Sequence, residues 1–534
     1  MKESSLLALN TASHYLQTVF AVVMGVFSGR WLFQALGVVD YGLLGTVGAL
    51  LAFVTILNAA TASSTARFFA IHIGRKDTAG AQEWFNTALL VHLSLATVLT
   101  GAGIVTGNWA FQHYFNIPIA RLSTARSVFG LSLFGVFATM VATPWIGMFT
   151  AKQRIIEMSL WSVARTILNF VFVWWLTFYQ GDAWLAYARG TVALSVALIT
   201  CQAIRAQWIF PECRIKFSAG INGGRILKLT EFVSWIFFAT MGDVIRKQGT
   251  NILLNRKFHP DTHPDVNASY SIGMRLSGYT QLFTQSLHTA ATPEISSSEG
   301  RHDRARAIEL ANRVSKFAVC STLILAVPLL VEADYLLALW LGNPPAFAST
   351  FVRFFILADL MDRLPMGQSL AVLASGRLGG QQVCKGVLRM ATIPLCWVLF
   401  QAGFSATSCG WVYCALSMLC ICSDVLWANA VIGMSARVWS RIVLAPCLAV
   451  AAVSTGLGFA VFALANEFHP LARLILVSTA GIAGVVLSCA TFAFDRREKA
   501  FVAGFAKKAL SQLKAVILAG RSLASSIDET GTSS

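Results

Sequence analysis

The chain has 534 residues, of which 56% are hydrophobic and 12% are charged, and its formal net charge is +16. Soluble domains carry about 25% charged residues, so this composition leaves too few charges to coat a chain of this length in water. On a soluble protein the positive charge would indicate a nucleic-acid partner. Here the basic residues lie mainly in short loops between apolar blocks, which is typical of membrane proteins, and we expect no nucleic-acid partner.

The apolar blocks are about 20 residues long, which is the length of a helix that crosses the hydrocarbon core of a bilayer. We therefore predict an all-α membrane protein with about fourteen transmembrane helices. In chain order the predicted spans are 10–36, 42–66, 84–107, 127–150, 157–179, 183–209, 230–255, 268–292, 314–340, 349–373, 382–402, 408–432, 441–464 and 471–493. The first block is too long for the apolar part of a secretory signal, so we interpret it as the first span.

The loops predict an orientation. Lys and Arg gather in the loops on one side of the predicted bundle, whereas the opposite loops hold little beyond Arg121, Arg256, Lys257 and Arg473. The basic side is expected to face the cytoplasm, together with both termini. Residues 495–534 form a tail that is basic at first and then rich in Ser and Thr, and we expect this last part to be disordered.

An internal repeat divides the predicted spans into two halves. The segment Gly74–Ala81 (GRKDTAGA) follows the second span, and the similar segment Gly300–Ala307 (GRHDRARA) follows the eighth, 226 residues later. Arg154 and Arg377 form a second pair, 223 residues apart. Six is an even number of spans, so the halves have the same orientation, as in transporters with parallel repeats. We predict an N-lobe at 1–210, a C-lobe at 211–435, two peripheral spans at 436–494 and the tail at 495–534.

Ionisable side chains inside predicted spans are costly in a bilayer, so each one is a candidate site residue. Candidates for binding an anionic substrate are the cations Arg30, Arg165, Arg189, Arg246, Lys247, Arg275 and Arg363. Candidates for coupling to an ion or for ion pairs are the acids Asp243, Asp359, Asp362 and Asp424. Span eleven adds Lys385 and Arg389, and Arg389 lies 224 residues after Arg165.

Simpler interpretations stay open for these charges. Asp243 and Arg246 are three residues apart and can pair on one helix face, which would leave Lys247 free to meet an anion. Arg30, Arg189 and Lys385 lie near an interface, where long side chains can extend to water. The deeper charges could also pair between spans and only hold helices together.

Signals of enzyme activity are poor. The sequence has no Walker motif, no GxSxG, no HExxH and no Cys/His spacing typical of a metal site. Its eleven cysteines lie almost all in apolar blocks and are interpreted as small packing residues. We predict no enzyme activity, no metal site and no cofactor, and leave a coupling cation, H⁺ or Na⁺, open.

Several segments resemble one family of membrane transporters. Leu36–Gly42 (LGVVDYG) is similar to the family's turn after span one, and Ala62–Phe68 followed by Gly74–Asp77 is similar to the end of span two and its loop. Further similar segments are Gln248–Asn255 (QGTNILLN), Val266–Ala268, Ala290–Ile295 and the Ala374–Arg377 turn. Their order and spacing resemble the polysaccharide-transport branch of the multidrug/oligosaccharidyl-lipid/polysaccharide exporter superfamily, which includes O-antigen flippases.

This resemblance implies two six-helix lobes that alternate in access, without ATP hydrolysis by the chain. It implies a substrate such as an undecaprenyl-diphosphate oligosaccharide, moved from the cytoplasmic to the periplasmic leaflet of a bacterial inner membrane. The partners implied are the lipid-linked glycan, membrane lipids, and glycan polymerase and export machinery. Arg246, beside the matched QGTNILLN segment, is the cation that the resemblance favours most.

Three other functions are carried forward. A cation-coupled multidrug exporter of the same superfamily would favour acidic cavity residues. A membrane-embedded glycan-processing enzyme would need catalytic residues in a long outer loop, and the longest predicted one is 256–267. A scaffold protein would tolerate neutralisation of Arg246 and Arg363.

Overall fold

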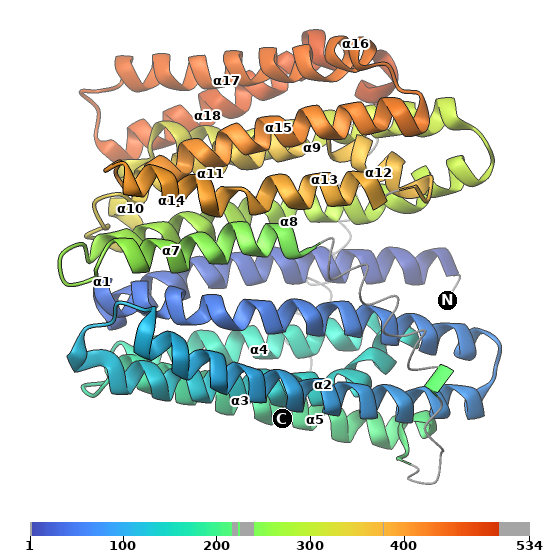
Figure 1. The fold of residues 1–534 in the computed structure, drawn as a ribbon. Coiled ribbons are helices and arrows are strands. Elements are labelled where there is room, and N and C mark those ends of the chain that lie inside the picture. Colours follow the sequence, from blue (N-terminus) through green and yellow to red (C-terminus); the bar gives the residue numbers. More distant parts are fainter. Residues whose placement is uncertain (1–2, 216–222, 225–239, 378, 501–534) are drawn as a thin grey trace, which may run out of the picture.

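The structure is a computed structural model that describes residues 3–215, 223–224, 240–377 and 379–500. All regular elements in these ranges are helices, most of them aligned along one direction (Figure 1). The first bundle contains α1 (Glu3–Gly74), α2 (Thr78–His113), α3 (Ile119–Ala151), α4 (Ile155–Leu176) and α5 (Ala183–Ile209).

The second bundle lies above the first in Figure 1. It contains the π-helical turn η2 (Ile245–Gly249), α7 (Thr250–Lys257), α8 (Asp265–Gly300), α9 (Arg304–Val331), α10 (Ala333–Leu341), α11 (Ala348–Arg363), α12 (Met366–Ala374), α13 (Gly379–Met390), α14 (Thr392–Gln401) and α15 (Ser408–Ile432). At its edge lie α16 (Ala436–Trp439), η3 (Ser440–Leu444), α17 (Ala445–Leu464), α18 (Pro470–Ser488) and η4 (Cys489–Ala493).

Ten helices in the described part of the chain are long and apolar enough to cross a membrane. The count of ten is lower than the predicted fourteen for two reasons. The helix α1 contains two predicted spans, and α8 is long but too polar to be counted as a membrane span. The predicted span 349–373 is also divided, between α11 and α12, and the span 230–255 lies partly outside the described residues. The count of fourteen stays a prediction, and the all-α membrane fold is confirmed.

One predicted span has wrong boundaries. We expected a single helix at 314–340, but α9 begins earlier, at Arg304, and ends at Val331, and α10 follows separately. Pro328 lies inside the last turn of α9, and the backbone N–H of Glu332 closes that turn on the Pro328 carbonyl. The apolar pattern continues across this break, so hydropathy alone does not reveal it.

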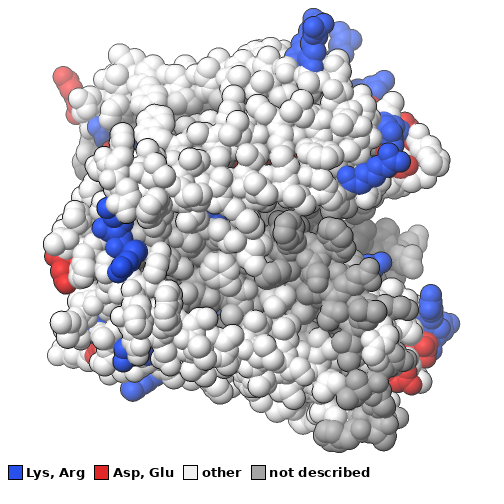
Figure 2. All heavy atoms as spheres, in the orientation of Figure 1, with Lys and Arg blue, Asp and Glu red and all other residues white. Residues whose placement is uncertain are grey.

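Charged side chains gather at the two ends of the helices, and the flanks between them are almost free of charge (Figure 2). Large apolar side chains are exposed on these flanks; the side chains of Val105 and Trp208 are 69% and 81% exposed. A soluble protein would bury such residues, whereas lipid tails solvate them.

The internal repeat is confirmed in the geometry of the loops. Asp77 and Asp303 each cap the next helix through a carboxylate oxygen, which accepts from the backbone N–H of Gly80 at 2.8 Å and of Arg306 at 3.1 Å. The residue before each aspartate has a left-handed backbone, with φ of 58° at Lys76 and 60° at His302. The second pair of loops repeats this feature at Gln153 and Gly376, each one residue before the paired arginines.

The two bundles touch near the end that carries α10. The side-chain amide of Asn255, in α7, accepts from the backbone N–H of Asn116, after α2, and donates to its carbonyl, each at 3.1 Å. In return, the side chain of Asn116 donates to the Asn255 carbonyl at 3.2 Å. Trp340 of α10 donates to the Val26 carbonyl of α1 at 2.7 Å. These bonds cross from one bundle to the other and fix their relative position at this end.

The last helices pack against α9. Glycines at positions 458 and 481, in α17 and α18, leave room for Val327 of α9, since a Cβ atom there would lie 3.0 and 2.6 Å from its side chain. The buried Lys316 of α9 donates to the carboxylate of Glu498, beyond η4, at 2.5 Å. Arg473 of α18 also binds the buried Glu332, between α9 and α10, at 2.6 Å. The peripheral helices are therefore joined to the second bundle by close packing and by ion pairs.

Candidate functional site

A cavity of about 300 Å³ lies where the second bundle meets the first. Its walls come from α1, α4 and α5, and one residue, Arg275, reaches in from α8. Arg165 of α4 is the other charged residue in the wall. The remaining polar lining consists of Ser28, Thr166, Asn169, Thr191 and Ser195, and no carboxylate is among the described residues that line this interlobe cavity.

The two arginines of this cavity have no acidic partner among the described residues. Arg275 donates to the hydroxyl groups of Tyr279 and Tyr41, each at 3.2 Å. Gly29 of α1 leaves room for it, because a Cβ atom there would lie 3.3 Å from the Arg275 guanidinium carbon. The guanidinium groups of Arg165 and Arg275 therefore leave donors for an anion, and Arg suits phosphate because its donors form a fork.

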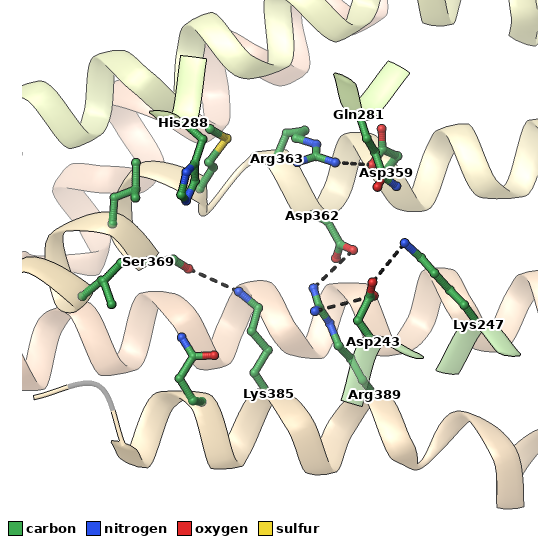
Figure 3. Close-up of a pocket in the computed structure, with 14 residues that line it drawn as sticks. Asp243, Lys247, Gln281, His288, Asp359, Asp362, Arg363, Ser369, Lys385 and Arg389 are labelled. Carbon is green, nitrogen blue, oxygen red and sulfur yellow. Dashed lines mark hydrogen bonds and ion pairs between the residues drawn. The ribbon is translucent and has the colours of Figure 1, made fainter. Parts of the chain in front are cut away.

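A second pocket, of about 280 Å³, lies inside the second bundle (Figure 3). We call it the C-lobe pocket. Its charged lining residues are Asp243, Lys247, Asp359, Asp362, Arg363, Lys385 and Arg389, and its neutral polar residues are Gln281, His288, Ser369 and Gln382. It therefore brings together predicted residues from three separate spans.

Each predicted acid forms an ion pair. Asp359 of α11 is bound by Arg363 at 2.6 Å and by the hydroxyl of Thr280 at 2.8 Å. Asp424 of α15 accepts from Lys385 of α13 at 2.7 Å, and its side chain is fully buried. Lys385 therefore does not extend to the interface. A role of these acids in coupling to H⁺ or Na⁺ stays a prediction.

Arg246 and Lys247 differ from our expectations. Arg246 is only 3% exposed and does not line the C-lobe pocket; it donates to Asp362 at 2.9 Å and to Asp243 at 3.3 Å. Lys247 is not free, because its ammonium lies 3.0 Å from Asp243. Both cations sit on the π-helical turn η2, and an aspartate three to four residues earlier is within reach of each.

Besides Arg246, two predicted cations lie in neither cavity. Arg30 of α1 donates to the Leu339 carbonyl of α10 at 3.0 Å, so it helps to join the bundles. Arg189 of α5 is exposed and has no hydrogen bond to a described residue. Gln281, His288, Ser369 and Gln382 line the C-lobe pocket but were not among the predicted site residues, because neutral polar residues are common in membrane spans.

Comparison with known proteins places the chain in a family. Residues 32–344 match the model of a family described as polysaccharide biosynthesis protein. No curated protein sequence matches the chain.

Solved structures share its fold. The lipid II flippase MurJ in an inward closed conformation superposes with a TM-score of 0.65 at 11% identity, over 91% of this chain and 98% of that one. An inward-facing multidrug resistance transporter of the MATE family gives a TM-score of 0.63 at 14% identity, over 77% and 94%. A transporter of the same superfamily from Pyrococcus furiosus gives 0.60 at 14% identity, over 81% and 98%.

The sequence identities are too low to assign a function. The structural similarity confirms the architecture that the sequence motifs predicted. The family match covers more than half of the chain and includes the contact between Asn116 and Asn255 that joins the bundles. The chain belongs to the polysaccharide biosynthesis protein family and has the fold of the multi-pass membrane transporters of the multidrug/oligosaccharidyl-lipid/polysaccharide exporter superfamily.

Proposed function

We propose that the chain is a flippase that moves an oligosaccharide linked to a polyprenyl diphosphate from the cytoplasmic to the periplasmic leaflet of a bacterial inner membrane. Glycan polymerase and export machinery would then take the unit at the periplasmic face. The observation that carries this proposal is the interlobe cavity, where Arg165 and Arg275 line a common space without a carboxylate in the described lining.

A diphosphate fits this pair of cations. It carries several negative charges and needs donors that lipid tails do not supply. Two guanidinium groups carry ten N–H donors, of which Tyr279 and Tyr41 engage two on Arg275, and the hydroxyl and amide groups around them offer more. Because Arg275 belongs to the second bundle and Arg165 to the first, an anion between them would be held by both lobes.

A multidrug exporter of the same fold is the second candidate. Organic cations would require a free carboxylate in a cavity. The described carboxylates of the C-lobe pocket are each engaged by Arg or Lys, and the described lining of the interlobe cavity has none. This arrangement favours an anionic substrate.

Flipping of a labelled lipid tests the proposal. Proteoliposomes with the full-length chain would receive a fluorescent polyprenyl-diphosphate oligosaccharide, and a membrane-impermeant reductant would report the fraction in the outer leaflet. We expect R165Q and R275Q each to slow flipping about tenfold or more, because each loses hydrogen bonds to a charged group. The control R126Q removes an exposed arginine of α3 that lines neither cavity.

Unchanged flipping in both cavity variants would refute the cavity assignment. In cells, a deletion strain should accumulate full-length lipid-linked glycan in the cytoplasmic leaflet. Normal glycan delivery together with altered drug sensitivity would instead support the exporter.

A further inference from the structure

The C-lobe pocket has one more cationic side chain than acidic side chains. Its described lining has the acids Asp243, Asp359 and Asp362 and the cations Lys247, Arg363, Lys385 and Arg389, which is three against four. Directly behind the lining, Asp424 pairs with Lys385 and Arg246 pairs with Asp362. Including this layer gives four acids and five cations, so the excess of one charge is the same in both counts.

The surplus cation is Arg389 of α13. Each acid has a closer partner: Asp359 has Arg363 at 2.6 Å, Asp424 has Lys385 at 2.7 Å, Asp362 has Arg246 at 2.9 Å, and Asp243 has Lys247 at 3.0 Å. Arg389 forms only longer ion pairs, 3.6 Å from both Asp243 and Asp362, which is beyond hydrogen-bonding distance.

The guanidinium of Arg389 is also incompletely bonded. Its Nε is buried without a hydrogen-bond partner among the described residues. Figure 3 shows the side chain extending from α13 toward Asp243 and Asp362. The Arg389 side chain as a whole is 18% exposed, so a ligand can reach it. A guanidinium has five donors and binds a carboxylate through two parallel hydrogen bonds, so a ligand carboxylate would satisfy donors that the described residues leave open.

The rest of the lining limits the ligand to a single negative charge. Three carboxylates in the wall would repel a phosphate that carries two charges. The amides of Gln281 and Gln382, the hydroxyl of Ser369 and the imidazole of His288 supply donors and acceptors for several hydroxyl groups. One carboxylate together with many hydroxyl groups describes an acidic sugar.

We propose that the C-lobe pocket binds a sugar that carries one carboxylate, of the hexuronic acid class, and that Arg389 pairs with this carboxylate. The proposal rests on the proposed function, because the sugar would belong to the glycan whose diphosphate lies in the interlobe cavity. The C-lobe pocket then selects the cargo by its sugar, and the interlobe cavity recognises the feature common to all lipid-linked glycans.

Ligand-dependent thermal stability of the purified full-length protein in lipid nanodiscs tests this assignment, since a ligand stabilises the state that binds it. Glucuronate is the probe, and glucose is the uncharged control of the same ring size. We expect glucuronate, but not glucose, to raise the melting temperature of the unaltered protein. R389Q should weaken glucuronate binding about tenfold or more, and R437Q, which removes an exposed arginine of α16, should leave it unchanged.

R389Q is expected to fold, because Asp243 and Asp362 keep their closer cations. R389K, which keeps the charge but loses the fork, should give intermediate affinity. Equal stabilisation by glucose, no stabilisation by glucuronate, or unchanged glucuronate binding by R389Q would overturn the proposal.

Pyrophosphate separates this proposal from the proposed function. It should still bind R389Q and should fail to bind R165Q and R275Q. Glucuronate binding without pyrophosphate binding would refute the diphosphate site and leave the sugar site standing, and the converse result would refute only the sugar site.

Discussion

At the scale of a single residue, Arg246 connects three elements of the second bundle. Its guanidinium contacts Asp243 near η2, Asp362 of α11 and the hydroxyl of Ser417 of α15 at 3.2 Å, and it lies over the ring of Tyr413. A cation held in this way has little freedom to follow a substrate. We therefore assign Arg246 a structural role.

Replacement of Arg246 by Met should destabilise the protein. Asp362 would lose its closest cation inside the bundle, and breaking one side of a buried ion pair costs about 3–5 kcal/mol. The measurement is the melting temperature of the purified protein. The double variant R246M/D362N should recover part of the loss, because it removes both members of the pair. A single variant as stable as the parent would contradict the structural role.

Pairing along one helix could be predicted from the sequence, and pairing between helices could not. The spacing of Asp243 and Arg246 predicted an ion pair that is present at 3.3 Å. The partner Asp362 is 116 residues away, and no spacing rule connects the two positions. The sequence therefore identified most of the charged residues of the C-lobe pocket as candidates, but not which of them are satisfied.

At the scale of an element, Gly37 allows α1 to contain two spans. Its φ of 71° and ψ of 178° lie in a region that is open essentially to glycine alone, and this kink separates the predicted spans 10–36 and 42–66. The LGVVDYG segment predicted a turn here because it resembles the family's turn after span one.

The variant G37A should therefore lower stability by about 1–3 kcal/mol through backbone strain alone. Space is not the cause, because no atom lies within 4 Å of the position that a Cβ would occupy. The matched control is G48A, in the same helix, where a Cβ also meets nothing within 4 Å and the backbone is helical. Equal thermal unfolding of both variants would show that the kink carries no strain.

The repeat is the element-scale feature that the sequence predicted best. Two octapeptides at a fixed offset predicted equivalent loops. Both loops have a residue with a left-handed backbone at the same position, followed by an aspartate that caps the next helix. The offset itself could not show that α8 is more polar than its counterpart in α1. That difference follows from what each helix faces, which depends on the packing of the lobes.

For the whole molecule, the contacts between the bundles bear on alternating access. The described polar contacts considered above lie near the end that carries α10, so the bundles would have to part there to expose that side. The reciprocal bonds of Asn116 and Asn255 are the most symmetric of them. Asn255 belongs to the QGTNILLN segment, which gives this motif a role in joining the lobes.

Loss of these amide bonds should loosen this end. We expect N255L to increase hydrogen–deuterium exchange in the segments around 114–117 and 255–267, since each unmade bond frees backbone groups that are now protected. The control N429L changes an exposed asparagine of α15. Exchange rates that match those of the control would mean that other contacts hold the bundles together.

The ion pair between Lys316 and Glu498 has a consequence for biosynthesis. The two residues are 182 positions apart, so α9 enters the membrane well before its carboxylate is made. At about 5–20 residues per second, the ammonium waits on the order of ten seconds or more for its partner. A nascent chain that stops before Glu498 keeps the Lys316 ammonium in the bundle without this carboxylate, and a buried charge that lacks its partner is destabilising.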